Sequence, residues 1–126
     1  MVLHTDAGDR ALVAMLTHPE RRSPANLDAE VYVGVRRAYL RRTIGRRAVG
    51  EALAELRVLP IERVPLSPLI EAAALYIDQL GGHDVFYVLL ALQHRASLLT
   101  SDRALDRAAS AVGIETIFID RAEDGG

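Results

Sequence analysis

The sequence predicts one α/β domain built on a small parallel sheet, and three observations support this prediction. The chain has 126 residues and a mass of 13.8 kDa, which is enough for a single hydrophobic core. Half of its residues are hydrophobic and a quarter are charged, as in folded globular proteins. From residue 61 onward, helical and strand-like patterns alternate, which favours right-handed crossovers between parallel strands.

The first half of the chain has the apolar spacing of helices. Helices are expected over residues 9–17, 26–42 and 46–57. Pro19 follows the first, Ser23 and Pro24 form a turn before the second, and Thr43 or Gly45 separates the second from the third. The second helix gathers its apolar residues on one face: Leu27, Val31, Gly34, Val35 and Ala38.

The pattern changes at residues 61–65, where side chains alternate between two flanking prolines. This segment predicts a short strand, and the prolines place it near a sheet edge. Ser67 can cap a helix over residues 68–80, with Pro68 at its first position and two glycines after its end.

The last third of the chain completes the alternation. A helix over residues 83–94 is apolar nearly all round and is expected to be buried. A strand over 97–100, a helix over 102–112 and a strand over 115–119 follow. A further strand is needed near the N-terminus, where only residues 2–5 can supply it. The polar end, residues 121–126, is expected to fray.

Composition excludes several classes of protein. No apolar run approaches the length of a membrane helix and no leader pattern is present, so a cytoplasmic protein is expected. The chain lacks cysteine, which excludes disulfides and thiolate metal sites and leaves hard cations as the metals to expect. The net charge of −2 argues against a uniformly basic nucleic-acid binder. No histidine spacing resembles a zinc site, and no serine lies in a nucleophile elbow.

Three carboxylates lie where simple solvation does not explain them. Glu30 lies at the edge of the apolar face of its helix. Asp84 opens the most hydrophobic helix of the chain, and Asp102 directly follows a strand, at the sheet edge where α/β folds bind ligands. Each has a structural alternative: Asp84 and Asp102 suit the first turn or cap of a helix, and Glu30 could pair with an arginine such as Arg37 or Arg57.

A cluster of these carboxylates would need a cation. Like charges brought together raise one another's proton affinity unless a divalent ion lies between them. Oxygen ligands of this kind are those that Mg²⁺ or Mn²⁺ prefers. The sequence therefore predicts a magnesium or manganese site, provided that the fold brings the three acids together.

Four ordered segments resemble a known family. They are SPANLDAEVYVGVRR, PIERVPLSP, GGHDVFYVLLALQHRASLLTSDRALDRAA and GIETIFI, and between residues 23 and 119 they resemble PIN-domain ribonucleases, specifically bacterial VapC toxins. The resemblance implies a three-layer α/β/α fold with a small parallel sheet. It also implies that Glu30, Asp84 and Asp102 help to bind catalytic Mg²⁺ or Mn²⁺. Asp28 faces away from Glu30, is expected to be solvated, and is not counted as a ligand.

The N-terminus departs from the family pattern, in which a first apolar strand ends in a metal-binding aspartate. Residues 1–6 could be a short version of this strand, with Asp6 as the fourth acid. The separation from Asp6 to Glu30 is shorter than the family usually has, which slightly favours the alternative that the strand and its aspartate are missing. His83 also departs from the family, and it could tune Asp84, contact substrate, or simply be exposed.

The resemblance further implies an activity and partners. The activity is metal-dependent hydrolysis of RNA phosphodiester bonds, and the partners are a VapB-like antitoxin protein and a second copy in a homodimer. One alternative is a catalytically degenerate PIN domain that binds an antitoxin or dimerises. Another is an RNA-processing nuclease that has no antitoxin.

All 15 basic residues are arginine. A bias in overall composition is the favoured explanation, and selection for phosphate contacts, which arginine makes better than lysine, is the second. Three arginine pairs lie close together: Arg36 and Arg37, Arg41 and Arg42, and Arg46 and Arg47. With Tyr32 and Tyr39 nearby, this patch could bind RNA phosphates, or it could be a solvated helix face.

Overall fold

The computed structural model describes residues 1–4 and 20–119. The expected helix over 9–17, the candidate ligand Asp6 and the polar end over 121–126 lie outside the described residues. Within them, the protein has a parallel sheet of five short strands in the order β3-β2-β1-β4-β5. The strands are β1 (Val2–His4), β2 (Arg22–Pro24), β3 (Glu62–Val64), β4 (Leu98–Thr100) and β5 (Thr116–Phe118).

Strand β1 is present at the centre of the sheet. It pairs with β4 through Val2 and Leu98, Leu3 and Leu99, and His4 and Thr100, and its other edge pairs with β2. The interpretation that the first strand is missing is therefore wrong, and the strand expected near residues 2–5 is short. Three residues are too few for a sequence pattern to show, and pairing on both edges supplies the hydrogen bonds that hold them.

Strand β2 was not expected, because Ser23 and Pro24 were assigned to a turn. Both side chains are buried, and the strand pairs in register with β3. The Ala25 N–H, just after the strand, donates to the Val64 carbonyl at 2.8 Å. Position between β1 and β3, rather than the propensity of the sequence Arg-Ser-Pro, makes this segment a strand.

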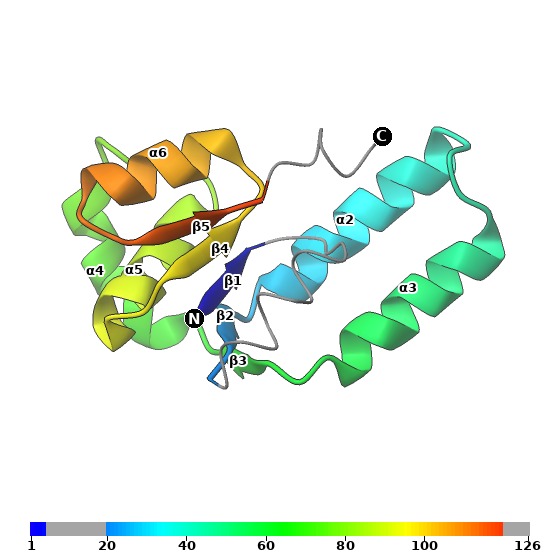
Figure 1. Cartoon of the computed structure of the whole chain (residues 1–126), viewed down its shortest axis with the longest axis horizontal. Coiled ribbons are helices and arrows are strands. Elements are labelled where there is room, and N and C mark those ends of the chain that lie inside the picture. Colours follow the sequence, from blue (N-terminus) through cyan, green and yellow to red (C-terminus); the bar gives the residue numbers. More distant parts are fainter. Residues whose placement is uncertain (5–19, 120–126) are drawn as a thin grey trace.

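Two sets of helices flank the sheet (Figure 1). Helices α2 (Leu27–Leu40) and α3 (Arg46–Val58) form a hairpin on one side. Helices α4 (Ile70–Ala73), α5 (Asp84–His94) and α6 (Arg103–Ala111) lie on the other. The chain passes along the sheet in one direction through β1, β2 and β3 and in the opposite direction through β4 and β5. Right-handed crossovers therefore place the two sets on opposite faces, as expected for a three-layer fold.

The core lies under α5. Its residues Tyr87, Val88 and Leu90 are completely buried, as are Leu98 and Leu99 of β4, so the prediction of a buried helix over 83–94 is confirmed. The predictions of strand 61–65 at a sheet edge, of helices over 26–42, 46–57 and 102–112, and of the last two strands are also confirmed, with small shifts of their ends. No residue of α3 is fully buried, so this helix is held less tightly than α5.

The expected continuous helix over 68–80 is broken into shorter pieces. Two 3₁₀ turns, Ser67–Leu69 and Ala74–Tyr76, flank the single α-helical turn α4. Ser67 is not a helix cap, because it is the first residue inside the 3₁₀ turn, whose N-cap is Leu66, and the N-cap of α4 is Leu69. Leu75 and Ile77 are 77% and 78% exposed. Without an apolar face against the core, a regular helix gains little from packing.

Candidate functional site

A hydrogen bond joins Glu30 of α2 to Tyr87 of α5. The Tyr87 hydroxyl donates to Oε2 of Glu30 and is also hydrogen-bonded to Ser23 of β2. Burial raises the pKa of Tyr87 well above its ordinary value, and the hydrogen bond and charge of Glu30, together with the charge of Asp84, raise it further. Tyr87 therefore stays protonated and acts as a donor. Within residues 1–4 and 20–119, neither Arg37 nor Arg57 forms an ion pair with Glu30, and the hydrogen-bond donor found there is Tyr87.

Asp84 is the first residue of α5, and its side chain is partly buried. The structure confirms the first-turn position, where the positive end of the helix favours a carboxylate. After burial and Glu30, the charge of Asp84 contributes to the raised pKa of Tyr87, so Asp84 and Glu30 act on the same hydroxyl. His83 is the N-cap of α5, and its side chain makes no cap bond. It is exposed, which confirms the simplest of the three interpretations given for it.

Asp102 caps α6 at the carboxyl end of β4. Its Oδ1 accepts hydrogen bonds from the N–H groups of Ala104 at 2.8 Å and Leu105 at 3.2 Å. The N–H of Asp102 donates to the Thr100 hydroxyl at 3.0 Å. The capping interpretation is therefore confirmed. Both cap bonds use Oδ1, which leaves Oδ2 of this exposed side chain outside the cap.

Glu30 is hydrogen-bonded to Tyr87, and the charge of Asp84 acts on the same hydroxyl. A complete metal group does not appear in the described part of the chain. Among residues 1–4 and 20–119, no three histidine, aspartate or glutamate side chains are grouped so that they could hold one metal ion. Asp6 is not among these residues. The four-acid metal site of Glu30, Asp84, Asp102 and Asp6 remains a prediction, and its donors are hard carboxylate oxygens of the type that suits Mg²⁺ or Mn²⁺.

Asp28 has a structural role, and the expectation that it is merely solvated is wrong. Its carboxylate pairs with the guanidinium of Arg63 on β3, with Nε 3.2 Å from Oδ2 and Nη2 3.2 Å from Oδ1. Arg63 also donates to the carbonyls of Leu56 and Leu59 at the end of α3. This pair ties α2, α3 and β3 together. Its exclusion from the ligand set agrees with this geometry.

Sequence reasoning missed Tyr87 and Ser23. Tyr87 lies three residues after Asp84, a spacing that places both on one face of α5. This spacing could have indicated Tyr87 as a neighbour of the acid. Ser23 gave no such signal, because only the pairing of β2 with β1 and β3 brings it under the helices.

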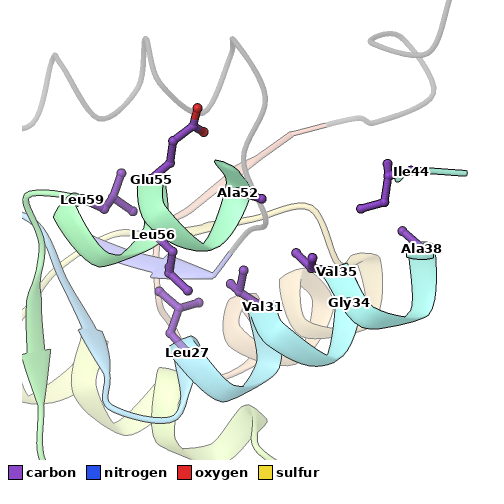
Figure 2. Close-up of a pocket in the computed structure, with 10 residues that line it drawn as sticks. All are labelled: Leu27, Val31, Gly34, Val35, Ala38, Ile44, Ala52, Glu55, Leu56 and Leu59. Atoms are coloured by element: carbon purple, nitrogen blue, oxygen red, sulfur yellow. The ribbon is translucent and has the colours of Figure 1, made fainter. Parts of the chain in front are cut away.

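A groove between α2 and α3 has a different chemistry (Figure 2). The apolar face predicted for the second helix lines one wall, and Ala52, Leu56 and Leu59 line the other. Leu27 and Leu56 point toward one another, whereas the Glu55 carboxylate points away from the groove. The volume is about 250 Å³, below the roughly 300–1,000 Å³ typical of small-molecule sites. This groove carries no catalytic set.

No helix in the described part of the chain is long and apolar enough to cross a membrane.

Comparison with known proteins agrees with this geometry. The PIN domain family matches residues 2–111, beginning within β1. Ribonuclease VapC3 of Mycobacterium tuberculosis, from strains CDC 1551 / Oshkosh and ATCC 25618 / H37Rv, is 37% identical over 106 residues, which cover 82% of this chain and 77% of the relative. The parallel α/β sheet, the order of the acidic motifs and these matches agree, and the chain belongs to the PIN-domain family, among its VapC-type members.

Proposed function

We propose that this protein is a Mg²⁺- or Mn²⁺-dependent endoribonuclease toxin that hydrolyses RNA phosphodiester bonds. The observation that supports it most is the hydrogen bond from the buried Tyr87 hydroxyl to Glu30, together with the charge of Asp84 acting on that hydroxyl. Two acids that raise the pKa of one buried hydroxyl, at the start of a buried helix, form an electrostatic cluster of the kind found at functional sites. Membership of a family whose matched relative is named a ribonuclease gives the chemistry.

The proposed metal ligands are Asp84, Asp102 and Asp6, with Glu30 beside them. Asp6 follows the end of β1 by the same number of residues as Asp102 follows the end of β4, and these strand ends, His4 and Thr100, are paired in the sheet. Equal offsets from paired residues support a joint role for Asp6 and Asp102 at the carboxyl edge of the sheet. A bound divalent ion would activate a water molecule and stabilise negative charge on the phosphate.

The chain itself supplies positioning and a proton acceptor. Tyr87 holds Oε2 of Glu30, and the other oxygen, Oε1, can accept a proton from the attacking water. The raised pKa of Tyr87, caused first by burial and then by Glu30, keeps its hydroxyl a donor throughout. The α6 cap fixes Oδ1 of Asp102 and orients Oδ2 for a ligand role.

The partners are proposed from the relatives. We propose a VapB-like antitoxin protein that neutralises the activity, a homodimer as the assembly and the cytoplasm as the location. RNA is the substrate class.

A catalytically degenerate PIN domain, which binds an antitoxin or dimerises without cleaving RNA, is the second candidate. It is favoured by one observation: the described residues contain no group of three metal-binding side chains. In this case Asp102 would serve α6 as a cap only.

RNA cleavage tests the two candidates against one another. A fluorescent single-stranded RNA is incubated with the protein in Mg²⁺, in Mn²⁺ and in EDTA. Nuclease function predicts cleavage that EDTA abolishes and that Asp84→Asn lowers about 100-fold or more. Asp78→Asn, at an exposed position outside α5, is the matched control and should retain wild-type activity. Equal background cleavage by wild type and Asp84→Asn would support the degenerate domain instead.

A further inference from the structure

We propose that the tip of the α2–α3 hairpin is a docking surface for single-stranded RNA, separate from the carboxylate site. We call this surface the arginine tip and define it by Tyr32, Arg36, Tyr39, Arg42 and Arg46. The choice of RNA as ligand rests on the proposed function, whereas the surface itself rests on charge, shape and aromatic placement.

Charge is strongly segregated in this part of the chain. Residues 31–50 contain six arginines and no acidic residue, although the whole chain carries a net charge of −2. All six arginines are exposed. The ion pair found there joins Arg47 to Glu51, at 3.0 Å, with side chains 93% and 62% exposed. The defining arginines have no carboxylate partner in the described part of the molecule, so they are available to a polyanion.

The start of α3 strengthens this field. Arg46 and Arg47 occupy the first turn of the helix, which contains no acidic residue. Cations at the positive end of a helix oppose its dipole, so this placement does not serve folding. The N-cap Gly45 has no side chain to accept from the first-turn N–H groups. Backbone dipoles and guanidinium groups therefore both favour an anion at this point.

The surface is concave and aromatic as well as basic. One hollow is lined by Tyr32, Arg36, Tyr39 and Arg46 with their apolar neighbours, and a second hollow shares Tyr39 and adds Arg42. The Arg46 guanidinium lies 5.4 Å from the centroid of the Tyr39 ring. Tyr32 is 51% exposed. A ring and a guanidinium plane of this kind can stack on a base.

The spacing along α2 distinguishes RNA from an acidic protein. Tyr32, Arg36 and Tyr39 are four and three residues apart, so they lie along one face of the helix with an arginine between two rings. Seven residues of α-helix span about 10 Å. Alternating rings and charge over this distance suit bases and phosphates of one strand, whereas an acidic peptide would gain nothing from the rings.

The arginine tip begins at Tyr32, which lies two residues from Glu30 and on another face of α2, and it extends far enough from the carboxylate site to make a second contact. Nine residues of α2 separate Glu30 from Tyr39, about 14 Å along the helix. A strand of several nucleotides could reach both places at once, which would raise affinity through two linked contacts. The arginine tip would then select longer single-stranded substrates over short ones.

Equilibrium binding of a fluorescein-labelled 12-nucleotide RNA of mixed sequence tests this proposal. Anisotropy is measured with the whole chain, in EDTA so that no cleavage occurs, over a series of salt concentrations. Arg36→Gln/Arg46→Gln is compared with Arg57→Gln/Arg107→Gln, which removes the same charge from exposed positions outside the tip. Arg36→Gln/Arg46→Gln should raise the Kd for RNA at least about tenfold. It should also reduce the slope of log Kd against log salt concentration by about 1.4, since two phosphate contacts are lost. Equal weakening by both double variants would overturn the proposal.

Two further measurements separate the possible causes. Tyr39→Leu should weaken RNA binding about fivefold or more if bases stack there. A polyglutamate peptide that competes with RNA at equal charge concentration would overturn RNA in favour of an acidic protein. Asp78→Asn, at an exposed position outside both sites, should keep wild-type RNA affinity. RNA binding by the wild-type protein without cleavage in Mg²⁺ or Mn²⁺ would contradict the proposed nuclease alone. Cleavage of the 12-mer by the wild type, together with unchanged RNA affinity of the Arg36→Gln/Arg46→Gln variant, would contradict the docking surface alone.

Discussion

The hydroxyl of Tyr87 donates a hydrogen bond to Oε2 of Glu30, although 57 positions of sequence separate the two residues. This bond connects the most deeply buried helix to the hairpin on the opposite face of the sheet. Its donor is completely buried, and its acceptor is a partly buried carboxylate. A bond of this kind affects stability and the orientation of the acid at the same time.

Removal of the Tyr87 hydroxyl should change both the stability of the protein and the orientation of Glu30, and the two effects can be measured separately. Tyr87→Phe keeps the ring in the core and leaves the Glu30 carboxylate without its donor. We expect the free energy of unfolding to fall by about 1–3 kcal/mol and kcat to fall about tenfold, with a smaller change in KM. Urea denaturation and steady-state RNA cleavage measure these quantities. Tyr76→Phe, at a partly buried tyrosine, is the control, and an equal effect there would contradict a special role for Tyr87.

High pH should destabilise the protein through the same residue. Burial, followed by the hydrogen bond and charge of Glu30, raises the pKa of Tyr87 above its unfolded value. The stabilisation is fully present below the unfolded pKa, near 10, and is lost as the pH rises from there toward the folded pKa. The decline attributable to Tyr87 should approach about 1.4 kcal/mol per pH unit above pH 10. Urea titrations between pH 9 and 11.5 should show this extra slope in wild type and not in Tyr87→Phe.

Substitutions of Asp102 distinguish a helix cap from a metal ligand. Asparagine caps helices about as well as aspartate but lacks its charge, whereas alanine does neither. Asp102→Ala should lower the free energy of unfolding by about 1 kcal/mol, and Asp102→Asn by less than about 0.5 kcal/mol. Both variants should lose metal-dependent cleavage. Thermal unfolding and the RNA assay give the answer, and full activity in Asp102→Asn would limit Asp102 to capping.

The pair of Asp28 and Arg63 should affect stability alone. Asp28 is 45% exposed at its side chain, so solvent screening keeps the pair weak and Asp28→Asn should cost less than about 1 kcal/mol. Cleavage should stay within about threefold of wild type, because Asp28 is held by β3 and the end of α3. Loss of cleavage comparable with that of Asp84→Asn would place Asp28 among the ligands after all.

Local patterns in the sequence were enough to predict most of the fold. The apolar period of α2 and α5 and the short apolar segment of β4 depend on neighbours in the chain, and all three were found. Strands β1 and β2 each contain three residues and are defined by their partners across the sheet. A sequence pattern cannot show such pairing, which explains why β1 was doubted and β2 was assigned to a turn.

The candidate site was predicted less completely for the same reason. Asp84 and Asp102 were found because helix starts and strand ends have recognisable neighbours. The sequence predicts an arginine as the partner of Glu30, because a carboxylate at the edge of a helix commonly forms an ion pair. The structure instead uses a neutral donor from the core, and its identity depends on how α5 packs against β1 and β2.

The central place of β1 has a consequence for synthesis on the ribosome. One edge of β1 pairs with β4, which is made long after β1. The nascent chain therefore cannot pair the second edge of β1 until residues 98–100 have left the exit tunnel, and contacts so distant in sequence close slowly. Glu30 is synthesised early but has no Tyr87 to hold it until then. Any activity that depends on the hydrogen bond between Glu30 and Tyr87 would thus be withheld until both halves of the sheet have been synthesised.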